Sequence, residues 1–462
     1  MIRAGFRSGF TLERRNALSG YLLRRISYPP DKDDKMKSRI GLLTLSIMAA
    51  STATQAYADG QADAKGFVED SSLKLRLRNA YISRDYKDGR DDKAEWGQAF
   101  MANYASGFTQ GTVGLGVDAF GLYAARLDGG KGKSGAGGID FFRKGENGTG
   151  DAADDLSRFG GAVKARFSNT VLKYGDMMPE LPVLNHDSSR LLPESYTGTM
   201  ITSNEIKGLE LVAGRFTAQT RKSAQGRDSG DVKSINVYGG SYKFNEAFSA
   251  AFYGSDVEDV LKKQYLNLNY VFVMSPEQSL ALDFNGYKTR LDKDFAVNDA
   301  RDNKIWSLAA TWSVGIHAFT IAHQRSTGET GYNYGGYRND GGVGDGGNSI
   351  FLANSYWSDF NGKDERSWQL GYGVNLSTLV TPGLSYKIAY VRGDNIDDGS
   401  NRGDGDEHEL FSQLSYVVQT GPAKDLSIRL RNSILKVSNN ASNYNAEGNE
   451  TRIFVDYPIN VF

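Results

Sequence analysis

Apolar and non-apolar residues alternate in segments of about ten residues along the chain, from position 73 almost to its end. Leu73, Leu75 and Leu77 alternate with basic residues, and the stretch 368–376 places an apolar residue at every second position. This period of two predicts β-strands with one apolar face, because an amphipathic helix would repeat every 3.6 residues. A turn or a loop rich in Gly, Asp and Asn separates these segments.

Residues 266–285 form one predicted hairpin, with a short turn at 274–278 between two alternating strands. Short turns of this kind alternate with long loops, such as 128–155 and 326–349. Short periplasmic turns and long extracellular loops are typical of a transmembrane β-barrel whose apolar face meets lipid. A water-soluble β-sandwich would alternate in the same way, and it is the alternative fold.

The region around Met36 has the pattern of a secretory signal peptide, with basic residues before the apolar run 40–50. Ala56-Tyr57-Ala58 is a small-x-small cleavage pattern, so the mature chain is expected to begin at Asp59. A signal peptide directs the chain out of the cytoplasm. Together with the barrel pattern, it predicts the outer membrane of a Gram-negative bacterium.

The chain therefore divides into three predicted parts. Residues 36–58 are the signal peptide, and residues 59–462 are the outer-membrane barrel. Residues 1–35 contain several Arg, a Pro-Pro pair and a charged run, and no part of a fold is expected there. They result either from a misassigned translation start, with Met36 as the true start, or from an unusually long signal.

Composition excludes several other classes of protein. The chain has 54 Gly, 9 Pro and no Cys. No stretch of about 20 apolar residues is present, so a helical membrane protein is excluded. The formal net charge is −1, and loss of residues 1–58 removes more basic than acidic residues, so the mature chain is acidic. A nucleic-acid partner is not expected, because such proteins are usually basic.

The length of the mature region limits the size of the barrel. An antiparallel strand with half a loop at each end takes roughly 20–25 residues, which permits about 16–18 strands. A barrel of this size encloses an aqueous channel instead of a packed interior. The predicted fold class is all-β, a transmembrane antiparallel barrel of about 18 strands with a loop folded inward as a constriction.

Basic residues recur on the inward phase of the predicted strands. Facing lipid, each would cost about 2–4 kcal/mol at the membrane midplane, so they are expected to face the lumen and to form a ladder of cations. The sets at 74–78 and 429–431 would be neighbours, because a closed barrel brings its first and last strands together. The alternative is that luminal carboxylates pair with these cations and only stabilise the wall. The residues are Lys74, Arg76, Arg78, Arg158, Lys164, Arg166, Arg429 and Arg431.

The segment 179–193 contains Pro179, Pro182 and Pro193, which exclude it from the middle of a sheet. It either folds into the lumen as a constriction or forms an ordinary surface loop. Two other hypotheses are weaker. A hydrolase would need a triad, for which His186 beside Ser188 is the only local candidate. A plugged or adhesive barrel would need a plug domain, and the chain has no spare residues for one.

No cofactor and no metal site are expected. The acid-rich stretch 394–407 is the best candidate for a loop calcium ion, but it lacks the spacing of an EF-hand.

Several stretches resemble the family of OprD-type substrate-specific outer-membrane porins, and the resemblance covers essentially the whole mature chain. They are Phe67–Ser72 running into Leu-x-Leu-x-Leu-Arg-Asn, Ser106–Gly114, Lys173–Asp176, the segment from Pro179 to Pro193, and Asn354–Asn361.

The resemblance implies an eighteen-stranded monomeric channel, in which a basic ladder guides carboxylate-bearing solutes to an eyelet built by inward loops. It adds Lys387 to the ladder, whereas a neighbouring position that some members fill with Arg is Ala389 here. This departure leaves open whether the solutes are basic amino acids or aromatic and other organic acids. The residues implied at the eyelet are Asp187, Ser188 and Arg190, with Asn354 and Ser355 in a second wall.

The partners expected are outer-membrane lipid, small carboxylate solutes and the barrel assembly machinery, which would act through the C-terminal strand ending at Phe462. Outer-membrane proteins commonly end in a Phe that is in phase with outward apolar residues. Here Val455, Tyr457 and Ile459 share the opposite phase. We therefore expect Pro458 to mark a bulge that restores the phase.

Overall fold

The computed structural model describes residues 60–128, 139–143, 152–226, 232–335 and 350–462. The predicted N-terminal extension and signal peptide fall in residues 1–59, outside the described residues. Strands dominate the described chain, and the helical elements there are two short 3-10 turns, η1 (Gln61–Asp63) and η2 (Asn439–Ala441). No helix in this described part is long and apolar enough to cross a membrane.

Eighteen strands form one antiparallel sheet, and two short strands, β6 (Glu180–Leu181) and β7 (Leu184–Asn185), pair separately. The strands of the large sheet are β1 (Ser72–Tyr86), β2 (Lys93–Ala105), β3 (Val113–Asp128), β4 (Asp155–Phe167), β5 (Thr170–Met177), β8 (Ser195–Ser203), β9 (Leu209–Thr220), β10 (Ile235–Lys243), β11 (Phe248–Val257), β12 (Leu261–Ser275), β13 (Gln278–Leu291), β14 (Asp302–Val314), β15 (His317–Gly328), β16 (Arg366–Asn375), β17 (Leu384–Ile396), β18 (Gly405–Val417), β19 (Ser427–Val437) and β20 (Gly448–Asn460).

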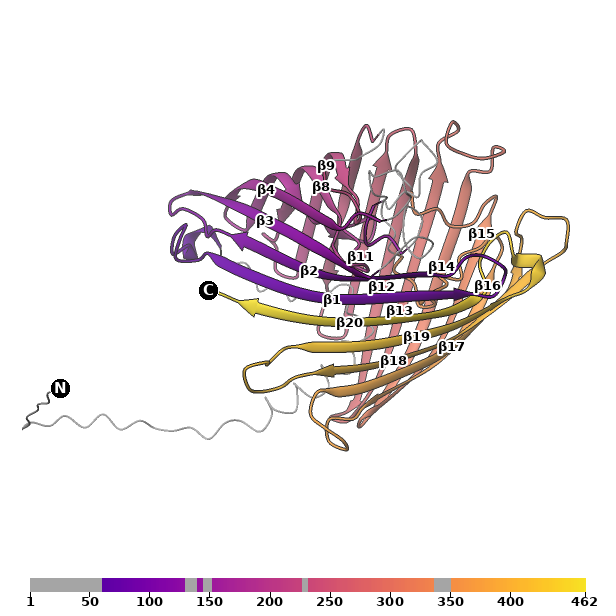
Figure 1. Cartoon of the computed structure of the whole chain (residues 1–462). Coiled ribbons are helices and arrows are strands. Elements are labelled where there is room, and N and C mark those ends of the chain that lie inside the picture. The colour runs from indigo at the N-terminus through magenta and orange to yellow at the C-terminus, as the bar shows by residue number, and fades with distance from the viewer. Residues whose placement is uncertain (1–59, 129–138, 144–151, 227–231, 336–349) are drawn as a thin grey trace, which may run out of the picture.

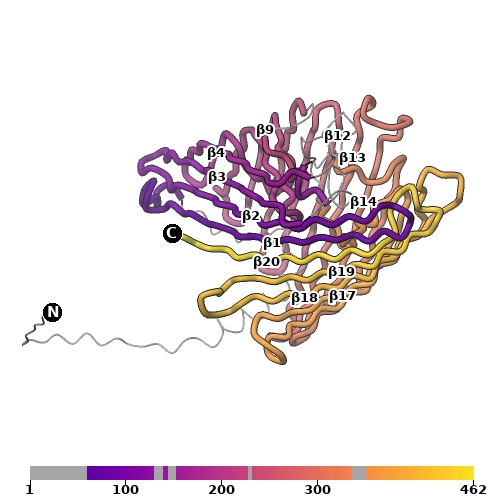
Figure 2. The backbone as a smooth tube through the Cα atoms, in the orientation of Figure 1, coloured from indigo at the N-terminus to yellow at the C-terminus, as the bar shows by residue number. Residues whose placement is uncertain are grey.

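The sheet closes on itself. Strand β1 pairs with β2 on one side and with β20 on the other, and Figures 1 and 2 show it lying between these two strands. The pairing of β1 with β20 runs from Lys74↔Asn460 to Tyr86↔Gly448. A closed sheet leaves no edge whose backbone groups would lack hydrogen-bond partners in lipid. The predicted barrel of about 18 strands is confirmed, and the β-sandwich alternative is wrong.

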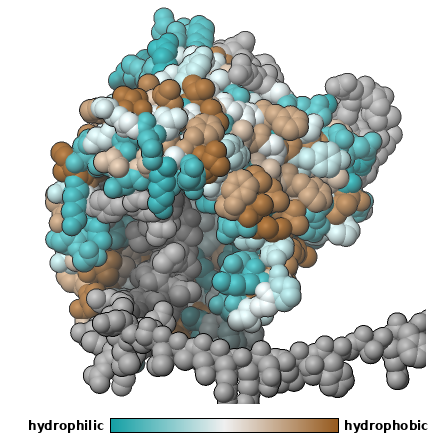
Figure 3. Space-filling view, turned by 90° about the vertical axis from the view of Figure 1, so that its left-hand side faces the viewer, coloured by the Kyte–Doolittle hydropathy of each residue, from teal (hydrophilic) through white to brown (hydrophobic). Residues whose placement is uncertain are grey.

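The alternation along each strand separates two faces. On β16, Leu370 keeps 65% of its surface exposed and Trp368 keeps 56%, whereas Gln369 between them is buried. The exposed apolar residues form the outer face, which meets lipid, and the positions between them form the luminal face. The molecule is hollowed on the side seen in Figure 3, where a recess opens between polar and apolar surface patches.

The two ends of the barrel differ in their connections. At one end the strands are joined by short turns such as 168–169, 276–277 and 315–316, and at the other by long connections such as 178–194 and 329–365. Barrels place short turns in the periplasm and long loops outside the cell. The end with short turns, where β1 begins and β20 finishes, is therefore periplasmic.

The predicted bulge at Pro458 is wrong. The register between β1 and β20 is continuous past Arg76↔Pro458. Strand β19 pairs with β20 only as far as Ser427↔Asp456, so Pro458 lies beyond the end of that neighbour. Its missing backbone N–H therefore removes no bond to β19, and the strand needs no bulge to accommodate it.

The separation of faces predicts opposite effects for two adjacent substitutions on β18. Leu414 is exposed on the outer face, and Ser415 lies on the luminal face. Leu414→Arg is expected to destabilise the barrel by about 2–4 kcal/mol, because the guanidinium would enter hydrocarbon. Ser415→Arg should have a much smaller effect. Urea-induced unfolding from phospholipid vesicles measures both, and equal losses would contradict the assignment of the faces.

Candidate functional site

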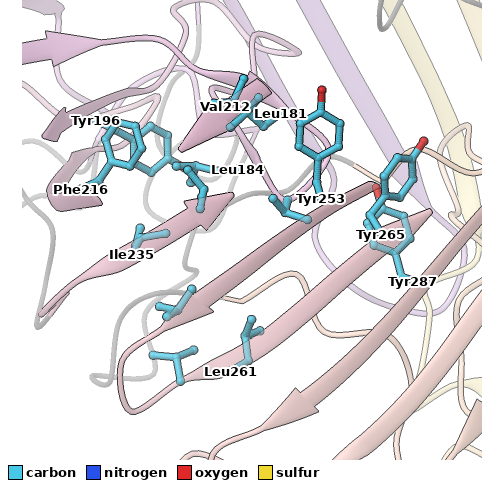
Figure 4. Close-up of a cluster of buried hydrophobic side chains, with 14 of the residues drawn as sticks. Leu181, Leu184, Tyr196, Val212, Phe216, Ile235, Tyr253, Leu261, Tyr265 and Tyr287 are labelled. Atoms are coloured by element: carbon cyan, nitrogen blue, oxygen red, sulfur yellow. The ribbon is translucent and has the colours of Figure 1, made fainter. Parts of the chain in front are cut away.

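Two extracellular connections fold into the lumen. Leu181 and Leu184, from the connection between β5 and β8, pack in one buried cluster with Tyr253 and Tyr265 of the wall (Figure 4). Residues 350–352, which precede β16, join the same cluster. Inward-facing aromatic and aliphatic residues thus provide an apolar inner surface on which both connections rest.

Tyr287 on β13 ties the two connections together. Its hydroxyl donates to the carbonyl oxygen of Pro182 at 3.1 Å and accepts from the backbone N–H of Phe351 at 3.2 Å. A second buried cluster lies on the inner face of β1 to β4, where Leu191 and Leu192 pack against Ile82 and other wall residues. The segment 179–193 therefore lies inside the barrel, and the alternative of an ordinary surface loop is wrong.

Arg78 joins the first inward connection to the wall. Its guanidinium donates to Asp456 at 2.7 Å and to the carbonyl oxygens of Ser188 at 2.9 Å and Arg190 at 2.8 Å. Only 5% of Arg78 is exposed. Because charge-assisted hydrogen bonds to a buried cation are strong, this side chain fixes the position of residues 188–190.

Two further cations hold the same connection, one from strand β4 and one from the connection that follows β9. Arg158 is buried and donates to the carbonyl oxygens of Pro193 and Arg221, each at 2.5 Å. Lys222 forms an ion pair with Asp187 at 2.6 Å, and both side chains are buried.

The charge state of Asp187 follows from its surroundings. Burial alone would raise its pKa, but the cations Lys222 and Arg190 outweigh it and hold the pKa well below the ordinary value. The carboxyl is therefore ionised across the physiological pH range. It is engaged by Lys222 and by the backbone N–H of Ser189 at 2.8 Å.

Near the periplasmic end of β4, Lys164 bonds to β3 and to the turn between β2 and β3, and Arg166 bonds to the start of the described chain. Lys164 donates to Asp118 at 2.6 Å and to the carbonyl oxygen of Ser106 at 2.8 Å. Arg166 donates to Gln61 at 3.0 Å. Both cations lie over the ring of Phe108, at 4.9 and 4.3 Å from its centroid.

The remaining cations of the predicted ladder are more exposed. Lys74, Arg76 and Arg429 are exposed, and Lys387 and Arg431 are half-buried. Arg76 and Lys74 share the luminal phase of Arg78 on β1, and Arg429 and Arg431 alternate with the outer-face residues of β19. Strand β20 lies between β1 and β19, so the sets at 74–78 and 429–431 flank one strand.

Aromatic rings separate these cations from one another. Arg78 and Arg429 lie at 5.3 and 5.1 Å from the ring centroid of Phe454 on β20. Arg431 lies 4.7 Å and Lys387 lies 5.9 Å from the ring centroid of Phe411 on β18. The luminal wall from β17 to β1 therefore presents cations interleaved with ring faces.

The residues implied at the eyelet have different surroundings. Arg190 donates to the carbonyl oxygen of Ile139 at 2.8 Å, and Ser188 contacts the wall through its backbone. Asn354 is fully buried and donates to Ser367 at 2.9 Å. The hydroxyl of Ser355 donates to Asp359. The side chains of Asn354 and Asp187 are therefore engaged in holding loops in place.

Some residues of the site were not predicted from the sequence. Glu450 accepts from Arg84 at 2.8 Å and from Arg452 at 2.5 Å, and these groups sit beside the cations already described. In the sequence, every second position from 450 to 454 is occupied by Glu450, Arg452 and Phe454, and less polar or apolar residues lie between them. This alternation could have identified β20 as part of the basic wall. No comparable sequence signal identifies Lys222.

The weaker hypotheses find no support in this geometry. The Nδ1 atom of His186 lies 3.0 Å from the carbonyl oxygen of Pro179, so that nitrogen is engaged by the backbone and not by Ser188. Among the described residues, no group of three or more His, Cys, Asp or Glu side chains is placed to hold a metal ion.

A closed barrel with a lipid-facing apolar surface, a charged lumen and inward loops defines a channel of the outer membrane. Residues 65–461 match the outer membrane porin, OprD family. The chain belongs to this family, whose members are channels and not enzymes. It is thus a substrate-specific porin of the outer membrane.

Individual relatives agree with this assignment. Porin D of Pseudomonas aeruginosa is 42% identical over 443 residues, which cover 91% of this chain and 98% of that protein. The crystal structure of Acinetobacter baumannii OccAB1 has a TM-score of 0.80 at 36% identity, covering 87% of this chain and 99% of that one. The crystal structure of Pseudomonas aeruginosa OpdK with vanillate has a TM-score of 0.72 at 31% identity, covering 86% and 100%.

The buried pair of Asp187 and Lys222 predicts a non-additive mutant cycle. Asp187→Asn removes the carboxylate that pairs with the buried Lys222 ammonium, and breaking such a buried pair typically costs about 3–5 kcal/mol. We expect faster hydrogen exchange in residues 184–194 and noisier single-channel current. Asp187→Asn combined with Lys222→Met should restore much of the order, because the buried ammonium is removed together with the carboxylate. Additive losses in the double variant would contradict the pairing.

The same pair predicts the dependence on pH. Because the pKa of Asp187 is lowered in the folded chain, its stabilisation is fully present above the ordinary Asp pKa of about 3.9. The stabilisation is lost only as the pH falls through the lowered pKa. Current noise should therefore stay constant from neutral pH down to roughly pH 4 and increase below it.

Proposed function

We propose that this porin allows selective passive diffusion of small carboxylate-bearing solutes along a luminal path of cations. The observation that carries the proposal is the set of accessible cations, Lys74, Arg76 and Arg429, with Arg431 and Lys387 beside them. They lie on neighbouring strands of one wall, from β17 through β20 to β1. A solute that leaves one cation therefore meets the next within a short distance.

The spacing suits movement from one cation to the next. Alternate residues on one strand are about 6.6 Å apart, and neighbouring strands are about 4.8 Å apart. A carboxylate 4 Å from a guanidinium gains about 1 kcal/mol in water and about 4 kcal/mol at an effective dielectric constant of 20. Attraction of this size favours entry and still permits release toward the next cation.

The cations of the ladder have two roles in this proposal. Arg78, Arg158, Lys164 and Arg166 are buried and bonded to loop or wall oxygens, so they fix the lumen and its constriction. The exposed cations contact the solute. At the constriction, Asp187, Ser188 and Arg190 define one side, and the loop containing Asn354 and Ser355 defines the other.

The aromatic faces support carboxylates that carry a flat ring as candidate solutes. Phe454 and Phe411 lie between the cations, so a planar acid is able to pair with a guanidinium and contact a ring at once. Vanillate, present in the OpdK structure, is an aromatic carboxylate. Basic amino acids, which also carry a carboxylate, are the second solute class to test.

The remaining features of the proposal concern the mature protein. We propose cleavage before Asp59, supported by Gln61, which is buried and donates to the carbonyl oxygen of Thr109 at 2.8 Å. The barrel would act as a monomer, and the C-terminal strand ending at Phe462 would engage the barrel assembly machinery. N-terminal sequencing of the membrane-purified protein tests the cleavage point.

Liposome uptake of arginine, benzoate and a neutral sugar tests the solute class and the path. Arg76→Gln, Lys387→Gln, Arg429→Gln and Arg431→Gln in one variant should reduce carboxylate uptake by about tenfold or more, since each cation contributes on the order of 1 kcal/mol. Sugar uptake should change little, because a neutral solute gains no such attraction.

The matched control removes four exposed cations outside the lumen, through Lys87→Gln, Arg90→Gln, Lys207→Gln and Lys424→Gln. It should transport carboxylates at the wild-type rate. Equal uptake by the luminal variant and this control would refute the proposed path.

A further inference from the structure

A second set of cations lies on the outer face of the barrel, at the extracellular ends of neighbouring strands. All of these side chains are exposed, and each occupies the phase of the lipid-facing residues on its strand. We call this set the outer basic belt. Its members are Lys262, Lys288, Arg290, Lys304, Arg325, Arg366, Arg392 and Lys436.

The strand register joins the belt into one continuous surface from β12 to β19. The register pairs that connect it are Lys262↔Arg290, Lys288↔Lys304, Trp306↔Arg325, Arg325↔Arg366, Trp368↔Arg392, Arg392↔His408 and His408↔Lys436. Of the eight strands from β12 to β19, β18 alone carries no Lys or Arg of the belt, and its outer-face His408 lies between Arg392 and Lys436, so the belt spans almost half of the barrel's circumference.

The belt contains like charges directly opposite each other. Lys288 faces Lys304 across β13 and β14, and Arg325 faces Arg366 across β15 and β16. Such pairs destabilise a sheet by themselves. Within the described part of the chain, Lys288, Lys304 and Arg325 form no ion pair that would offset this repulsion.

Some members of the belt do have acidic partners. Lys262 pairs with Asp256 at 2.8 Å, and Arg366 pairs with Asp394. The belt nevertheless keeps an excess of positive charge, because Lys288, Lys304, Arg325 and Arg392 have no such partner among the described residues.

A row of aromatic rings lies directly below the belt. His323 stacks on Trp368 with ring centroids 4.3 Å apart, and its ring lies 5.4 Å from that of Trp306. Aromatic girdles of a transmembrane barrel mark the level of the membrane interface. The cations above them therefore lie at the depth of the lipid headgroups of the outer leaflet.

The belt does not extend over β1 to β4. The corresponding outer-face positions at the extracellular ends of β1 to β4 carry no Lys or Arg in the described strands. They are Ser83, Asp85, Ala94, Trp96, Ala125, Leu127, Asp155 and Ser157. General solubility or a uniform interaction with the membrane would not require this asymmetry.

We propose that the outer basic belt binds the phosphate groups of the phosphorylated glycolipid that forms the outer leaflet of this membrane. Guanidinium groups bind phosphate oxygens in pairs, and lysine ammonium groups bind them as point charges. A bound phosphate placed between like-charged partners turns their repulsion into shared attraction. The acyl chains of the same lipid cover the apolar strand surface below the belt.

The test uses the full-length mature barrel, purified in a neutral detergent and freed of lipid. Bisphosphorylated lipid A should raise the melting temperature of the wild type. Heat-dependent gel migration measures this temperature. Lipid A without phosphates should raise it much less, and inorganic phosphate alone should not reproduce the shift. These arms separate the lipid phosphate from acyl-chain contacts and from a free anion.

The variant Lys288→Gln, Lys304→Gln, Arg325→Gln and Arg392→Gln should bind bisphosphorylated lipid A about a hundredfold more weakly, given the typical effect of each cation near anionic lipid. Without lipid it should melt at or above the wild-type temperature, because the like-charge repulsion is relieved. Single Lys288→Gln should weaken lipid binding in part, and it tests the proposal with a smaller change to the barrel.

The control variant Lys87→Gln, Arg90→Gln, Lys207→Gln and Lys424→Gln removes the same amount of charge elsewhere and should bind like the wild type. Undiminished lipid binding by the belt variants would overturn the proposal. So would an equal shift from lipid A without phosphates, or an equal shift from inorganic phosphate. None of these measurements depends on which solute the lumen carries.

Discussion

Satisfaction of the backbone hydrogen bonds within the sheet is the constraint on which the rest of this structure depends. In hydrocarbon no water is present to bond an exposed N–H or carbonyl, so a membrane-spanning sheet must close. Closure through β1 and β20 then gives every strand one side toward lipid and one toward the lumen. The period of two in the sequence follows from these two faces. The same alternation places basic side chains in the aqueous interior or at the membrane interface.

The luminal face combines two uses of positive charge. A buried guanidinium needs oxygen partners, and the inward connections supply backbone carbonyls to Arg78 and Arg158. Those bonds hold the inward connections in place, and in the proposed function they keep both side chains from contact with solutes. Arg76 and Arg429 lie closer to the periplasmic end and stay accessible. The same residue type is therefore a structural tether at one level of the barrel and a proposed solute contact at another.

The sequence was sufficient for the fold because alternation is a local property of each strand, as in residues 368–376. It was also sufficient for the inward phase of the cations. It could not separate tethers from accessible cations, because the partners of Arg158 come from Pro193 and Arg221, far along the chain. The bulge expected at Pro458 was wrong for a similar reason, since the length of the neighbouring strand β19 is not visible near position 458.

The water accessibility of residues on the two faces of β1 and β19 tests most directly the claim that basic residues face an aqueous lumen and apolar residues face lipid. The chain has no Cys, so each introduced thiol is the only one present. Arg76→Cys and Arg429→Cys, assembled in membranes, should react rapidly with a charged, membrane-impermeant thiol reagent, and an added carboxylate solute should slow the reaction. Leu75→Cys and Leu430→Cys should remain unreactive. Labelling at the two leucine positions, together with no labelling at the two arginine positions, would contradict the account.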